Sequence, residues 1–136
     1  MTKPSSGAIR VIGVFATAED RASLREFFNN FRWTSQFVDS CSTLEQVLWP
    51  FEPDVVLTDS ELARGESWKD ILRSAQERPT RIPVVVSSRL ADERLWAEVL
   101  NLGAYDLLVK PFIAAEVQSV VGAAAATTRP LVRRAG

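Results

Sequence analysis

Short apolar runs rich in β-branched residues recur along the chain and alternate with stretches of helical periodicity. Five of these runs are predicted strands, and they cover residues 9–15, 34–39, 54–58, 82–88 and 105–110. The first, third and fourth runs are almost continuously apolar, which is typical of strands that are covered on both faces. The second run, TSQFVD, alternates polar and apolar residues, so we expect it nearer an edge of the sheet.

A helical pattern follows each predicted strand. The first begins near Thr17, the second shows a capping-box signature of Ser42 and Glu45, and the third begins with Ser67. The fourth covers residues 90–103 and the fifth covers residues 112–126.

The fourth helix has two faces with different predicted surroundings. Its stripe of Leu95, Val99 and Leu102 is predicted to face the sheet, and Gly103 is predicted to end the helix. The side chains of Trp96 and Leu100 are turned away from this stripe, so we expect both to be partly exposed.

The repeated strand–helix order predicts an α/β fold with a parallel sheet wrapped by helices on both faces. For five such units the expected arrangement is a flavodoxin-like, doubly wound sheet with strand order 2-1-3-4-5. The functional crevice of such a sheet lies at the carboxyl ends of strands 1 and 3. The residues at or just after those strand ends are therefore the candidates: Phe15, Ala16, Asp59, Ser88 and Lys110.

The composition excludes several kinds of site. The chain has 136 residues and no histidine, which excludes Ser-His-Asp catalysis, histidine-based metal sites and a phosphohistidine carrier. Its single cysteine, Cys41, excludes an internal disulfide and structural zinc, and we interpret it as a small packed or half-exposed residue rather than a nucleophile. Any chemistry must therefore use carboxylates, hydroxyls, lysine and arginine.

The net charge and the hydropathy of the chain exclude two further kinds of partner, nucleic acids and membranes. The net charge of −1 predicts no nucleic-acid surface, and no apolar run is long enough to span a membrane. The chain also begins without a signal peptide, so we expect a cytoplasmic protein. We expect one domain over residues 9–126, a disordered N-terminal segment over residues 1–8, and a short tail over residues 127–136.

Three segments carry a family resemblance. PDVVLTD (53–59), IPVVVSSRLADERLWAEVLNLGA (82–104) and GAYDLLVKPF (103–112) resemble the receiver domains of two-component response regulators. The resemblance covers residues 9 to 125 and implies phosphorelay signalling rather than enzymatic turnover, with a histidine kinase as a partner. It implies that Asp59 accepts the phosphoryl group, that Ser88 and Lys110 contact it, and that Mg²⁺ bridges aspartate and phosphate.

The chain departs from this family at the acidic pair that holds the metal. Phe15 and Ala16 occupy those two positions, and neither side chain can bind Mg²⁺. We interpret Glu19 and Asp20 as acids that favour the start of the first helix. At most, Asp59 and Glu61 remain as metal-binding carboxylates. We therefore expect a direct Asp59–Lys110 ion pair without bound metal.

Three functions remain open at this point. The first is a pseudo-receiver that acts through protein–protein contacts with little or no Mg²⁺-dependent phosphorylation. The second is a conventional Mg²⁺-dependent receiver, and the third is a flavodoxin-like small-molecule binder. Both receiver hypotheses imply contacts with other signalling proteins. They also allow a homodimer through the fourth helix, the fifth strand and the fifth helix. The predicted switch and interface residues are Ser88, Tyr105, Leu107, Trp96 and Leu100.

Overall fold

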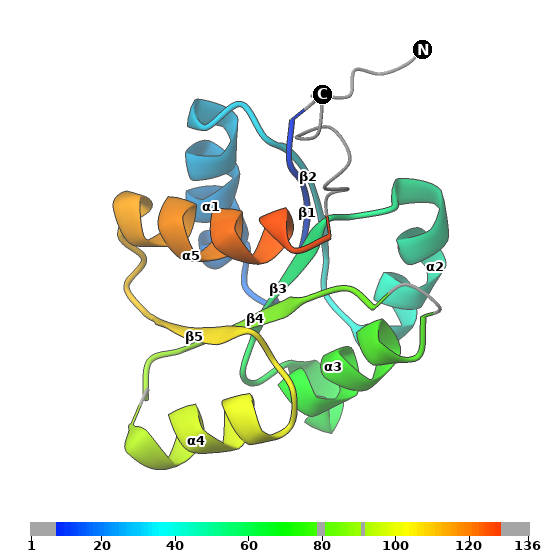
Figure 1. Cartoon of the computed structure of the whole chain (residues 1–136), viewed down its shortest axis with the longest axis vertical. Helices are drawn as coiled ribbons and strands as arrows, with labels where there is room; N and C mark the ends of the chain where they lie inside the picture. The colour runs from blue at the N-terminus through cyan, green and yellow to red at the C-terminus, as the bar shows by residue number, and fades with distance from the viewer. Residues whose placement is uncertain (1–7, 79–80, 91, 129–136) are drawn as a thin grey trace.

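The computed structural model describes residues 8–78, 81–90 and 92–128 and contains a sheet of five parallel strands (Figure 1). The strands are β1 (Arg10–Val14), β2 (Thr34–Val38), β3 (Val55–Asp59), β4 (Val84–Ser88) and β5 (Asp106–Val109). Their order is β2-β1-β3-β4-β5, which confirms the predicted doubly wound arrangement and places the alternating strand β2 at an edge. The switch point between β1 and β3 is therefore in the middle of the sheet.

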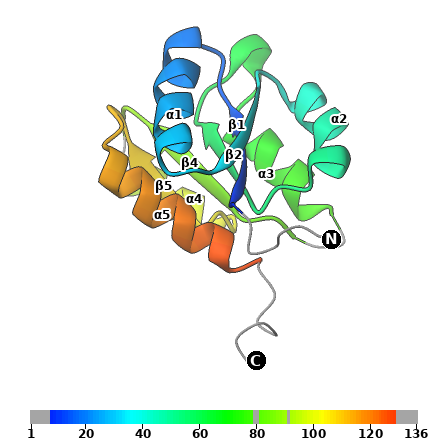
Figure 2. The same cartoon turned by 90° about the horizontal axis from the view of Figure 1, so that it is seen from above.

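Helices cover both faces of the sheet. They are α1 (Ala18–Asn30), α2 (Cys41–Phe51), α3 (Trp68–Gln76), α4 (Glu93–Asn101) and α5 (Ala114–Ala126). Helices α1 and α5 lie on one face, and α2 and α3 lie on the other, which the view from above shows clearly (Figure 2). Alternate residues along each central strand thus enter two separate cores.

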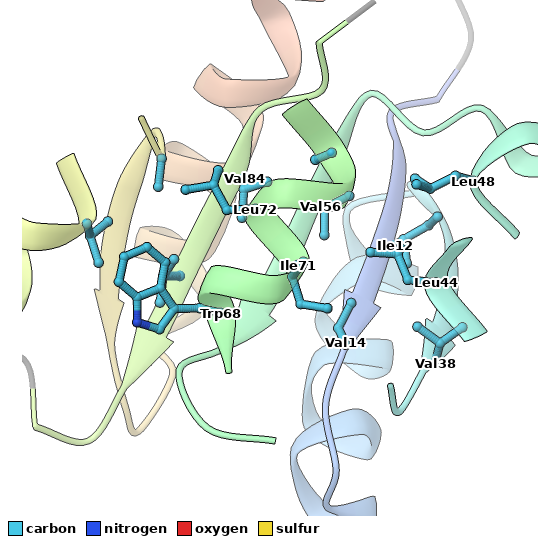
Figure 3. Close-up of a cluster of buried hydrophobic side chains, with 14 residues drawn as sticks. Ile12, Val14, Val38, Leu44, Leu48, Val56, Trp68, Ile71, Leu72 and Val84 are labelled. Carbon is cyan, nitrogen blue, oxygen red and sulfur yellow. The ribbon is translucent and has the colours of Figure 1, made fainter. Parts of the chain in front are cut away.

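The core under α2, α3 and α4 is built mainly from branched aliphatic side chains. Val56 and Val84 of the sheet lie near Ile71 and Leu72 of α3, and Ile12 lies beside Leu44 of α2 (Figure 3). The core on the opposite face is more aromatic, since the buried side chain of Phe28 stacks on the rings of Trp33 and Phe37. These two cores fix β1 and β3, and therefore the position of the crevice.

Two helix details differ from the sequence-based predictions. Ser40, rather than Ser42, caps α2, because its side chain accepts a hydrogen bond from the backbone N–H of Thr43. The prediction that Leu102 faces the sheet is wrong, since its side chain is 47% exposed at the end of α4. The helix ends there because Gly103 adopts a φ of 106°, which turns the chain out of the helical path.

The predicted terminal segments fall largely outside the part of the chain that the structure describes. This holds for residues 1–7 of the N-terminal segment and residues 129–136 of the tail. In the described ranges, none of the helices combines the length and the apolar character needed to cross a membrane.

The packing predicts that Phe28→Ala lowers the free energy of unfolding by about 3–5 kcal/mol, because it removes a fully buried ring from the aromatic core. Leu102→Ala serves as the control and is expected to cost less than about 1 kcal/mol, because the side chain is half exposed. Urea unfolding of both variants measures the difference. Equal losses would contradict this placement of the two side chains.

Candidate functional site

The parallel sheet brings the predicted site residues to one edge. Phe15 directly follows β1, Asp59 ends β3, Ser88 ends β4 and Lys110 directly follows β5. The register pairs Asp59 with Ser87 and Ser88 with Val109, so the strand ends are level with one another. Residues far apart in the sequence therefore meet at the switch-point crevice.

The ammonium group of Lys110 is the centre of this site. Its Nζ donates a hydrogen bond to Oδ2 of Asp59 at 2.9 Å, which is the ion pair expected from the sequence. It donates a second hydrogen bond to Oδ2 of Asp20 at 2.8 Å. The lysine side chain is 8% exposed, and the side chains of Asp59 and Asp20 are 14% and 15% exposed. Two carboxylates thus share one largely buried cation.

The protonation of Lys110 depends on these two carboxylates. Burial by itself lowers the pKa of this amine, because it disfavours the charged form. The hydrogen bonds and charges of Asp20 and Asp59 act in the opposite direction and outweigh burial. The pKa of Lys110 is therefore raised above its ordinary value of 10.5, and the group is charged at neutral pH.

Asp20 is a site residue that the sequence analysis did not identify. It lies in the first turn of α1, as expected, but its carboxylate contacts Lys110 rather than serving only the helix dipole. The start of α1 is held close to the crevice because Nη1 of Arg21 donates a hydrogen bond to the carbonyl oxygen of Phe15 at 2.7 Å. The only sequence signal was the position of Asp20 in a helix that starts beside the carboxyl end of β1.

The residues at the acidic-pair positions do not fit a magnesium site. The ring of Phe15 is fully buried, and Nζ of Lys110 lies 5.9 Å from its centroid. Ala16 is exposed and offers no side-chain ligand. Within the described ranges, no three His, Cys, Asp or Glu side chains are grouped so that they could hold a metal ion. The carboxylates of Asp20 and Asp59 both contact the lysine instead.

The other predicted site residues have separate surroundings. The other carboxylate oxygen of Asp59, Oδ1, accepts a hydrogen bond from the backbone N–H of Ser60 at 2.9 Å. The hydroxyl of Ser88 is buried and accepts a hydrogen bond from the backbone N–H of Leu90 at 3.1 Å. Glu61 is exposed, and its backbone pairs with Ser67 in an isolated bridge. Ser88 and Glu61 thus lie near the crevice without a described hydrogen bond to Asp59.

Apart from Ser88, which ends β4 at the crevice, the predicted switch and interface residues lie on the side of the molecule that carries α4 and β5. Trp96 is 50% exposed and Leu100 is 37% exposed, in agreement with the helical pattern. Leu107 packs partly against the core beneath α4, whereas Tyr105 precedes β5 and is more exposed. On this side of the molecule, the exposed aromatic side chains of Trp96 and Tyr105 therefore lie near the apolar side chain of Leu107.

The central ion pairs lead to a stability prediction. Lys110→Met is expected to lower the free energy of unfolding at neutral pH by about 3 kcal/mol, because it leaves two poorly solvated carboxylates without their cation. A raised pKa stabilises the folded state below the ordinary value of 10.5, and this contribution is lost as the pH rises through the raised value. The difference from wild type should thus be constant from pH 7 to about pH 10 and shrink only above that.

Lys69→Met is the matched control for this measurement. Lys69 forms an ion pair with Glu98 at 2.7 Å, but the two side chains are 50% and 42% exposed. Its loss should cost about 0–1 kcal/mol because solvent screens the pair. Urea unfolding between pH 7 and pH 11 compares the two variants. A similar decrease in the free energy of unfolding in both would show that the ion pairs of Lys110 stabilise the fold no more than an exposed ion pair does.

Comparison with known proteins identifies the family of this fold and site. The family model for the response regulator receiver domain matches residues 17–122, which is most of the chain. Among curated proteins, regulatory protein AtoC of Escherichia coli (strain K12) is 33% identical over 69 residues. That match covers 51% of this chain and 15% of AtoC, so the chain corresponds to a small part of that relative.

Solved structures share the fold at low sequence identity. The receiver domain of a sensor histidine kinase from Pseudomonas aeruginosa, which has magnesium coordinated in its active-site cleft, is 16% identical with a TM-score of 0.77. The match covers 88% of this chain and 99% of that one. Full-length FixJ from B. japonicum is 19% identical with a TM-score of 0.81, over 93% of this chain and 62% of that one. With the fold, the crevice and the family match in agreement, the chain belongs to the response regulator receiver domain family of two-component signalling.

Proposed function

We propose that this domain is a pseudo-receiver that signals through protein–protein contacts in the cytoplasm with weak or no Mg²⁺-dependent phosphorylation. We propose that the receiver domain covers residues 9–126. Asp59 stands at the phosphoacceptor position, with Ser88 and Lys110 at the positions that contact the phosphoryl group. Receiver domains act in signalling rather than as enzymes in the usual sense, and they interact with histidine kinases and other signalling proteins.

The observation that carries this proposal is the shared contact of Lys110 with Asp20 and Asp59. Receiver domains typically use Mg²⁺ for phosphorylation. A cluster of carboxylates attracts a divalent cation because their mutual repulsion is relieved by it. Here the ammonium group of Lys110 already relieves that repulsion. The site therefore has a weaker electrostatic reason to bind a metal ion.

The buried ring of Phe15 supports the same conclusion. It fills the end of β1, where this family has an acidic side chain, and extends the core beneath α1 and α5 to the crevice. An aromatic wall cannot ligate Mg²⁺ or neutralise the charge of a phosphoryl group. Without a metal ion, transfer to Asp59 would lose several kcal/mol of transition-state stabilisation.

A partner surface is proposed on the side formed by α4 and β5. A groove of about 310 Å³ lies there, lined by Asp92, Glu93, Trp96, Leu107 and Val109. Aromatic anchors next to apolar side chains are typical of the centres of protein interfaces. We propose that this surface binds a signalling partner or a second copy of the domain, with α5 at its margin.

The proposed function predicts no Mg²⁺-dependent phosphorylation of Asp59. Wild-type protein is incubated with acetyl phosphate, with and without MgCl₂, and analysed by intact mass spectrometry. We expect no phosphate adduct that depends on Mg²⁺ and no change in tryptophan fluorescence when Mg²⁺ is titrated, because the described carboxylates of the crevice are engaged by Lys110.

Asp59→Asn is the control that locates any adduct. An adduct that forms in the wild type only with Mg²⁺ and is absent in Asp59→Asn would refute the pseudo-receiver proposal and establish a conventional receiver. Equal capture of a partner by the wild type and Asp59→Ala would support phosphate-independent binding.

The proposed partner surface predicts that Trp96→Ala weakens self-association by about 2 kcal/mol or more, because a half-exposed tryptophan would lose its contacts at the interface. Sedimentation velocity over a range of concentrations measures this effect. Trp49→Ala is the matched control, since Trp49 is 70% exposed on α2, on a different side of the molecule. A wild type that stays monomeric, or equal effects of both substitutions, would rule out a homodimer through Trp96.

A further inference from the structure

Asp20 has a contact that its local position does not explain. It is the third residue of α1, and the pattern from Thr17 to Asp20 is that of a capping box. In a complete capping box, the acid at this position accepts a hydrogen bond from the backbone of the capping residue. The carboxylate of Asp20 instead has Oδ2 at 2.8 Å from Nζ of Lys110.

Helix α3 provides the comparison within the same molecule. Its third residue, Asp70, accepts a hydrogen bond from the backbone N–H of Ser67 at 3.0 Å and completes a capping box. In α1, the side chain of Thr17 accepts a hydrogen bond from the backbone N–H of Asp20, whereas the Asp20 carboxylate reaches Lys110, just after β5. Asp20 therefore contributes to the crevice in a way that Asp70, at the same helix position, does not.

The geometry makes Asp20 a competitor for the donors of Lys110. An ammonium group has three N–H donors, and two of them are directed at Asp20 and Asp59. The lysine side chain is 8% exposed and lies against the ring of Phe15, so it has little room to turn toward a new acceptor. A phosphoryl group on Asp59 would need these donors and would also face the negative charge of Asp20.

From these contacts we propose that Asp20 is an autoinhibitory residue that holds Lys110 and thereby suppresses capture of a phosphoryl group at Asp59. The inference rests on the proposed function, because it assumes that Asp59 is a weak phosphoacceptor rather than an efficient one. It identifies the residue that keeps the acceptor weak after the loss of the acidic pair. It also places this control in α1, outside the strand ends that form the rest of the crevice.

The reaction used to test this role is transfer from acetyl phosphate in a magnesium-free buffer with a chelator. A carboxylate oxygen of Asp59 forms a bond to phosphorus, the bond from phosphorus to the acetate oxygen breaks, and acetate leaves with the electron pair. No proton or redox partner is required for the balance. Intact mass spectrometry follows the rate, and Asp59→Asn verifies the position of the adduct.

Asp20→Asn should form the Asp59 adduct faster than the wild type, on the order of tenfold, because the substitution removes a nearby negative charge and frees a donor of Lys110. Glu19→Gln is the matched control, since Glu19 is exposed in the same helical turn and has no ion pair among the described residues. It removes the same charge from the helix start but should leave the rate unchanged. Circular dichroism verifies that each variant is folded.

Asp20→Glu distinguishes a specific clamp from a structural effect. A glutamate keeps the charge and the ability to bond to Lys110, so it should restore the low rate of the wild type. Equal rates for Asp20→Asn and Glu19→Gln, or a slower rate for Asp20→Asn than for the wild type, would overturn the role of Asp20. Rapid phosphorylation of the wild type with Mg²⁺ would instead refute the proposed function, and the magnesium-free ratio of Asp20→Asn to Glu19→Gln would still decide the role of Asp20.

Discussion

The contact of one lysine with two carboxylates organises the crevice of this receiver domain. Lys110 follows β5, Asp59 ends β3 and Asp20 lies in α1, so a single ammonium group joins three elements that are distant in sequence. Because all three side chains are largely buried, removing Lys110 leaves two negative charges that water cannot easily solvate. The position of α1 relative to the sheet and the electrostatic balance around Asp59 therefore depend on the same group.

The arrangement is linked to the packing of the sheet. Phe15 belongs to the core beneath α1 and α5 and contacts the ring of Phe112 edge to face. An acid at this position would be exposed to the repulsion of Asp59, whereas the phenyl ring gains apolar burial. The hydrophobic core is therefore continuous up to the crevice. The cation beside Asp59 is the ammonium group of Lys110, and Phe15 offers no ligand for a metal ion. A phenyl ring that is buried in the core at this position cannot also be a metal ligand.

The fold and the main site residues could be predicted from the sequence because they follow from periodicity and topology. Apolar strands place Asp59, Ser88 and Lys110 at one sheet edge whatever their neighbours are. The contact of Asp20 could not be predicted, because its place in the first turn of α1 gave that acid a sufficient local role with the helix dipole. The cap at Ser40 and the exposure of Leu102 were missed for a related reason. A helix end depends on which side chain bonds the first free backbone N–H groups and on the residue at which the helical path stops, and a periodic pattern encodes neither.

We infer that Lys110 takes the place of the metal ion in this crevice. A crystal structure determined at a high concentration of MgCl₂ tests this claim most directly, because it shows the ligands of Asp59 atom by atom. We expect Nζ of Lys110 to remain between the carboxylates of Asp20 and Asp59 in that crystal. A magnesium ion coordinated by Asp59, with Lys110 moved away from it, would contradict the account.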